Sequence, residues 1–138
     1  MKNKIKLLVA CVLIFVMTFS FAGCSPSVEG EWKLTVLSQS GIDYSIEEFC
    51  QEMNYSVEEV FGSMQINKDG TCSFNFVLGL SSYSFLGEWE FKRNTLFVKH
   101  DGDPDRLEFK YKNNTLIVDL SIYFPTLVFE KSEWQTII

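Results

Sequence analysis

Apolar and polar side chains alternate along most of the chain after residue 63, and this period of two is the strongest constraint on its fold. In the stretch 107–112, for example, Leu107, Phe109 and Tyr111 alternate with charged side chains. Successive side chains of a β-strand point to opposite faces, so such a segment buries one face of a sheet and exposes the other. The pattern predicts antiparallel strands and argues against a helical bundle.

Short turn sequences separate these segments, and Asn-Lys-Asp-Gly at 67–70 is typical of a hairpin turn. Residues 91–98 recur as a similar sequence at 111–118, which predicts successive hairpins of a meander. One further strand begins at Gly30, and Trp32, Leu34 and Val36 are expected on its inner face. The eight predicted strands are 30–36, 64–66, 72–78, 85–91, 96–100, 107–111, 116–120 and 127–129.

A change of period between the first two predicted strands indicates a short helix. Residues 38–44 are expected to form a loop, and Ser45 with Glu48 forms a capping box at the helix start. A further helical turn is expected from Ser56 to Gly62. The apolar face of the helix consists of Ile46, Phe49, Cys50 and Met53.

Closure of the sheet follows from the strand count, because a closed barrel has no exposed strand edges. The predicted fold is therefore all-β, an eight-stranded antiparallel up-and-down barrel with one short helix between strands 1 and 2. The helix would cover one mouth of the barrel. An open sandwich is the alternative.

The N-terminus has the features of a secretory signal that forms a helix. Lys2, Lys4 and Lys6 precede an apolar run at 7–19, which is shorter than the roughly 20 residues needed to span a bilayer. The sequence Phe-Ala-Gly-Cys that ends at Cys24 resembles the lipobox of bacterial lipoproteins. The resemblance implies a diacylglycerol on the Cys24 sulfur and cleavage just before this residue.

This interpretation divides the chain into a lipoprotein signal peptide at 1–23, a lipidated tether at 24–29 and a β-barrel domain at 30–138. Removal of 1–23 leaves nine basic and eighteen acidic residues, which changes the net charge from −6 to −9. Such a surface repels nucleic acid and anionic headgroups. The lipid is then expected to hold the protein at the outer, extracytoplasmic face of the cell membrane.

Cys50 and Cys72 are the cysteines that remain after processing, since Cys11 is removed and Cys24 carries lipid. Both lie on predicted apolar faces, in a compartment where disulfides persist. Two interpretations are open, a Cys50–Cys72 disulfide or two buried thiols. Two cysteines and one distant histidine lack the spacing of a metal site.

The sequence offers little for catalysis. His100 is the only histidine, beside the acidic loop 101–105, and is expected at the surface. No G-x-S-x-G, P-loop or dinucleotide motif is present, so we expect neither a cofactor nor an enzyme. The aspartates of 101–105 resemble the start of a calcium loop, but Lys112 occupies the position where a bidentate Glu is needed.

Several short motifs resemble those of lipocalin-type barrels and of the small lipocalin-like domains of bacterial lipoproteins. They are Gly30-Glu31-Trp32, the G-x-W start of the first strand, with 68–71, 87–91 and 94–96. The resemblance spans about 28–131 and implies a barrel that can bind a small hydrophobic ligand. The wall residues we expect to line such a site are Trp32, Phe74, Phe76, Trp89, Phe91 and Tyr111.

Whether the interior has room for a ligand stays open at this point. Nine large inward-facing rings favour a filled barrel, whereas Gly87, Val36, Val98 and Val118 favour a residual slot. A filled barrel would favour the alternative function, a protein-interaction or structural module that docks another envelope protein.

Overall fold

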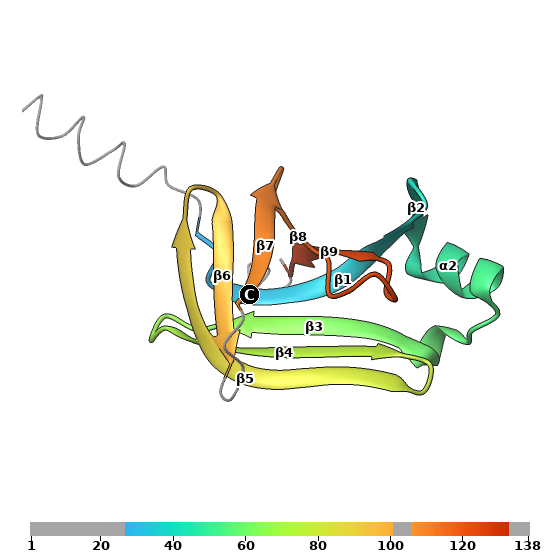
Figure 1. Ribbon diagram of the computed structural model, residues 1–138, viewed down its shortest axis with the longest axis horizontal. Helices are drawn as coiled ribbons and strands as arrows, with labels where there is room; N and C mark the ends of the chain where they lie inside the picture. The colour runs from blue at the N-terminus through green and yellow to red at the C-terminus, as the bar shows by residue number, and fades with distance from the viewer. Residues whose placement is uncertain (1–26, 101–105, 133–138) are drawn as a thin grey trace, which may run out of the picture.

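The computed structural model describes residues 27–100 and 106–132 (Figure 1). The predicted signal helix, Cys24, the loop 101–105 and the tail 134–138 lie outside the described residues. The helical segments are α2 (Ile46–Met53) and the short 3₁₀ turn η1 (Val57–Glu59). The strands are β1 (Gly30–Gln39), β2 (Ile42–Ser45), β3 (Val60–Ile66), β4 (Thr71–Leu78), β5 (Ser81–Lys92), β6 (Thr95–His100), β7 (Leu107–Lys112), β8 (Thr115–Val118) and β9 (Thr126–Lys131).

The predicted closed barrel is confirmed. From β3 to β9 each strand pairs antiparallel with the next, and β1 pairs with both β3 and β9. Trp32 of β1 lies opposite Met64 of β3, and Leu34 lies opposite Phe129 of β9. Eight strands thus close on themselves, so neither side of β1 remains an open edge along the barrel.

β2 is a ninth strand, which lies within the predicted loop 38–44. It pairs with the second half of β1 from Val36↔Ser45 to Gln39↔Ile42, through a tight turn at Ser40-Gly41 with φ of 55° and 77°. β3 pairs with β1 only as far as Lys33↔Ser63. β2 therefore pairs with the backbone of β1 along the part of its edge that β3 does not reach.

A register shift in β1 corrects one predicted inward residue. The pairing with β9 slips between Leu34 and Val36, which is a β-bulge. Beyond it, Leu37 is fully buried, whereas Val36 is only partly buried. A strict alternation from Trp32 fails here, because the bulge adds one residue and turns the following side chains to the other face.

The predicted helix is confirmed and spans Ile46–Met53. The Glu48 N–H donates to Ser45 Oγ at 3.2 Å, and Asn54 ends the helix in the left-handed conformation at φ 62°. The expected helical turn after Ser56 covers only η1. Residues 60–62 belong instead to β3, because Val60 and Gly62 continue its buried face and pair with β4.

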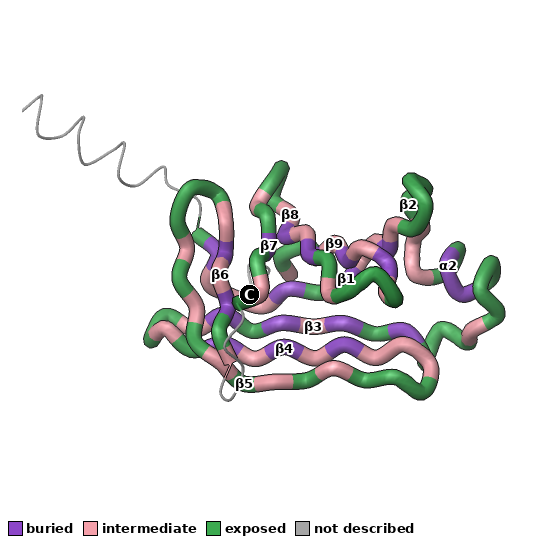
Figure 2. Tube along the Cα trace, in the orientation of Figure 1, coloured by how far each residue is buried: buried purple, intermediate pink, exposed green. Residues whose placement is uncertain are grey.

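The two ends of the barrel carry different turns, loops and helical segments (Figure 1). The N-terminal end carries the start of β1 and the turns 67–70, 93–94 and 113–114. The helix end carries α2, η1, the β4–β5 turn and the β8–β9 loop. Figure 2 shows buried positions recurring along β3 and β4, whereas β5 has none.

Candidate functional site

Aromatic rings pack on one another through the middle of the barrel, and Phe74 of β4 is their centre. Its ring lies 5.3 Å from Phe85, 5.8 Å from Phe129 and 5.9 Å from Phe109, measured between centroids. Phe74, Phe109 and Phe129 are all at most 2% exposed. The interior here is a packed core built from four different strands.

The N-terminal end is closed by further rings. Trp32 Nε1 donates to the Val28 carbonyl at 2.8 Å, and the Trp32 and Tyr111 rings pack in a T-shaped arrangement with 6.5 Å between their centroids. Trp89 Nε1 donates to the Asn67 carbonyl at 2.7 Å, and Phe91 packs against Tyr111 at 5.9 Å. These bonds satisfy both indole N–H groups and fix the rings across this mouth.

The six predicted lining residues therefore do not share one cavity. Trp32, Phe74 and Phe76 are at most 2% exposed and belong to the packed core. Trp89, Phe91 and Tyr111 are half-buried and pack against that core from its edge.

The residues that suggested a residual slot do not form one. A Cβ built on Gly87 would lie 2.5 Å from the Lys99 carbonyl oxygen, so the space beside Gly87 is occupied by the backbone of β6. Val98 and Val118 are 1% and 2% exposed, and Val36 lies beyond the bulge. A filled middle of the barrel, one of the two alternatives, agrees better with these contacts.

The inner face of β5 is nevertheless less covered than its neighbours. Its inward-facing rings, Tyr83, Phe85, Trp89 and Phe91, are all half-buried, whereas those of β4 are buried. The His100 ring stacks on Phe85 with 4.7 Å between centroids and forms a T-shaped pair with Tyr83 at 6.5 Å. The only histidine is thus half-buried within an aromatic cluster, whereas the sequence suggested a surface position beside the acidic loop. Tyr83 was missed because the predicted strand began at residue 85.

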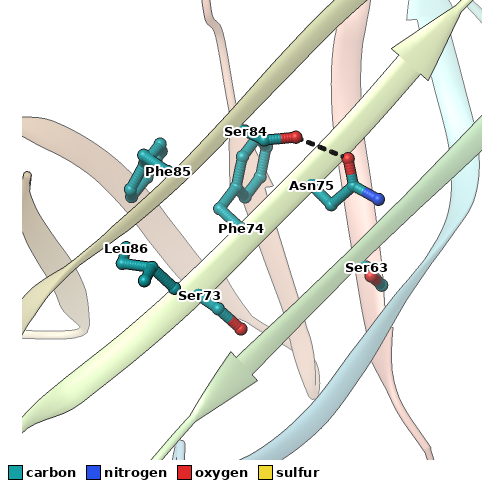
Figure 3. Close-up of a pocket in the computed structure, with 7 residues that line it drawn as sticks. All are labelled: Ser63, Ser73, Phe74, Asn75, Ser84, Phe85 and Leu86. Atoms are coloured by element: carbon teal, nitrogen blue, oxygen red, sulfur yellow. Dashed lines mark hydrogen bonds between the residues drawn. The ribbon is translucent and has the colours of Figure 1, made fainter.

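A shallow depression lies on the opposite, outer face of β3, β4 and β5 (Figure 3). Its volume is about 480 Å³, and it is lined by Ser63, Ser73, Phe74, Asn75, Ser84, Phe85 and Leu86. Ser84 Oγ donates to Asn75 Oδ1 at 2.7 Å. The lining contains hydroxyl, amide and apolar groups but no charge or imidazole, so it can hydrogen-bond a neutral group but lacks a base to activate a serine. These small polar residues carry no sequence signal.

Cys50 and Cys72 are free thiols, so the disulfide between them does not form. Cys50 lies on α2, and its thiol donates to the Ser56 carbonyl at 3.5 Å. Cys72 pairs with Ile66 at the N-terminal end, whereas Leu78 pairs with Val60 at the helix end. Six strand residues span about 20 Å, far beyond the roughly 7 Å that a disulfide allows between Cα atoms.

Burial raises the pKa of the Cys72 thiol to about 11, against an opposing hydrogen bond from the Gly87 backbone. Burial also raises the pKa of Cys50, with Glu47 and Glu59 adding to the effect. Both groups are protonated at neutral pH and therefore poor nucleophiles.

We expect Cys72 to make the fold less stable at high pH. A thiol with a raised pKa in the folded state adds stability below its ordinary value of 9.0, and loses it as the pH rises toward 11. Denaturant unfolding of wild type and Cys72→Ala between pH 8 and 11 should show an excess loss in wild type of about 1–2 kcal/mol. Groups common to both proteins affect the two curves equally, so parallel curves would contradict the prediction.

Two further features bear on function within the described residues. Their side chains include no group of three or more His, Cys, Asp or Glu arranged to hold a metal ion. Neither helical segment in 27–100 or 106–132 has the length and hydropathy of a membrane-spanning helix.

Comparison with protein families matches residues 28–120 to the family described as a lipocalin-like domain. Comparisons with curated proteins and with solved structures found no match. The matched segment covers more than half of the 138 residues and runs from just before β1 to just after β8. With its closed eight-stranded antiparallel barrel, the chain belongs to the lipocalin-like domain family.

Proposed function

We propose that this protein is a bacterial lipoprotein, anchored through Cys24 at the outer face of the cell membrane, whose lipocalin-like domain binds a small hydrophobic ligand. The observation that carries the ligand proposal is the half-buried inner face of β5. Tyr83, Phe85, Trp89 and Phe91 present ring surface there that the packed core leaves partly accessible. Burying such surface against an apolar ligand is favourable in proportion to the area removed from water.

The chemistry of this face sets the ligand class. Aromatic rings line it, and the His100 imidazole packs among them. The neighbouring Glu88 and Glu90 are exposed on the alternate face of β5. The proposed ligand is therefore largely apolar, with at most one polar group.

Oleate provides a direct test, because Trp89 lies within the proposed site. Titration of oleate into the full chain should change tryptophan fluorescence, and Trp89→Phe should remove most of that change. Trp134→Phe, which alters an indole outside the described residues, is the matched control and should keep the response. If oleate and a panel of other apolar probes leave the fluorescence unchanged, the ligand proposal is wrong.

The anchor is supported by the resemblance of the residues before Cys24 to a lipobox and by the basic and apolar segments that precede them. We expect Cys24→Ala to release the domain from the membrane or to leave it unprocessed, because no acyl chain could be attached. Membrane fractionation and the mass of the intact protein measure both outcomes. Firm membrane retention of folded, processed Cys24→Ala protein would contradict lipidation.

A second candidate is an interaction module of the cell envelope. It is favoured by the filled middle of the barrel and by exposed apolar side chains at the helix end. An enzyme is the third candidate, and the sequence offers it little support, because it contains no G-x-S-x-G, P-loop or dinucleotide motif.

A further inference from the structure

Exposed apolar side chains are concentrated at the helix end of the barrel. Eight large hydrophobic residues of the described chain are exposed, and seven of them lie at this end. Leu80, Ile122 and Tyr123 are almost completely exposed, at 106%, 94% and 88%. We call the seven the helix-end rim: Ile42, Met53, Val57, Phe61, Leu80, Ile122 and Tyr123.

Contacts between the segments that carry the rim hold them together. The Gly79 N–H donates to the Glu59 carbonyl at 2.8 Å, which ties the β4–β5 turn to η1. Phe76 packs against Phe124 at 5.8 Å, which ties β4 to the β8–β9 loop. Phe49 of α2 stacks on Tyr55 at 6.2 Å. The rim is therefore a fixed surface, and Figure 1 shows its segments gathered at one end of the molecule.

The charge around the rim has a single sign. Segments 40–61, 78–81 and 118–126 contain no lysine or arginine. Their acidic residues are Asp43, Glu47, Glu48, Glu52, Glu58, Glu59 and Asp119. Hydrogen bonds from the Ser56 backbone N–H and hydroxyl lower the pKa of Glu59, which keeps this carboxylate ionised.

We propose that the helix-end rim docks a protein surface that presents apolar side chains among lysines and arginines. This deepens the second candidate function and rests on it. Apolar side chains at the centre with complementary charge around them are the composition of a specific interface. A bilayer with anionic headgroups would be repelled by the seven acids. A second copy of the chain, rim to rim, would bring like charges together.

The test uses the full chain in a mild non-ionic detergent and a fluorescein-labelled peptide composed of leucine and lysine. Fluorescence anisotropy should report binding after subtraction of a titration with detergent alone. Leu80→Ser combined with Ile122→Ser should weaken binding about tenfold or more, since each removes an exposed apolar anchor. Leu86→Ser is the matched control, because Leu86 is 75% exposed but lies on the outer face of β5.

Three outcomes would overturn the proposal: equal binding by the rim variant and wild type, equal binding of a serine–lysine peptide of the same charge, and no binding. Two further measurements test whether the rim instead contacts a membrane or a second copy of the chain. Cosedimentation of the Cys24→Ala chain with phosphatidylglycerol vesicles, lost in the rim variant, would assign the rim to a membrane. A dimer in sedimentation, lost in the same variant, would assign it to a second copy. Neither result depends on oleate binding or on the anchor.

Discussion

Phe74→Ala should be among the most destabilising substitutions in this protein, lowering the free energy of unfolding by about 3–5 kcal/mol. Phe74 is 2% exposed, and its ring contacts Tyr83, Phe85, Phe109 and Phe129. Truncation removes the ring and leaves a cavity at the point where four strands meet. Urea unfolding monitored by circular dichroism measures the effect.

Two further variants serve as controls for the Phe74→Ala measurement. Phe74→Leu keeps most of the volume and should cost clearly less than the alanine variant. Asn75→Ala changes the next residue of β4, whose side chain faces the outer depression, and should stay within about 1 kcal/mol. A loss below about 1 kcal/mol for Phe74→Ala would mean that the middle of the barrel is not packed as described.

Gly87→Ala should destabilise the fold by about 3 kcal/mol, although it adds a single methyl group. The added Cβ would lie 2.5 Å from the Lys99 carbonyl oxygen and 3.2 Å from the His100 Cα, both backbone atoms of β6. Neither can rotate away, so β5 and β6 must separate where Gly87 pairs with His100.

This variant also distinguishes the two readings of Gly87 that the sequence allowed. If Gly87 bordered an empty slot, alanine would fill it and leave stability unchanged or increased. Thermal unfolding of Gly87→Ala and of Ser82→Ala, an exposed position on the same strand, makes the comparison. Equal melting temperatures would contradict the close approach of β5 and β6.

The packed middle and the half-covered wall of β5 together limit where a ligand could lie. A ligand in the centre would have to displace the Phe74 cluster, whereas one against β5 needs only the partly exposed rings. The ligand and docking proposals use different surfaces, so Trp89→Phe and the rim variant should each affect one function alone.

Local sequence patterns determined most of the architecture. Alternation in segments such as 107–112 placed the strands and their buried faces, because side-chain direction along a strand depends only on neighbouring residues. The turn 67–70 and the capping of α2 by Ser45 were likewise local signals. The closed barrel followed, since a meander of eight strands with one apolar face buries that face best by closing.

Contacts between distant segments decided the rest. The bulge that brings Leu37 inward depends on how β1 meets β9, and the distance between Cys50 and Cys72 depends on where α2 settles relative to β4. The cost of a side chain at Gly87 is set by the path of β6. Residue type and spacing do not contain these distances, so only the tertiary structure could decide which inward residues are core and which remain accessible.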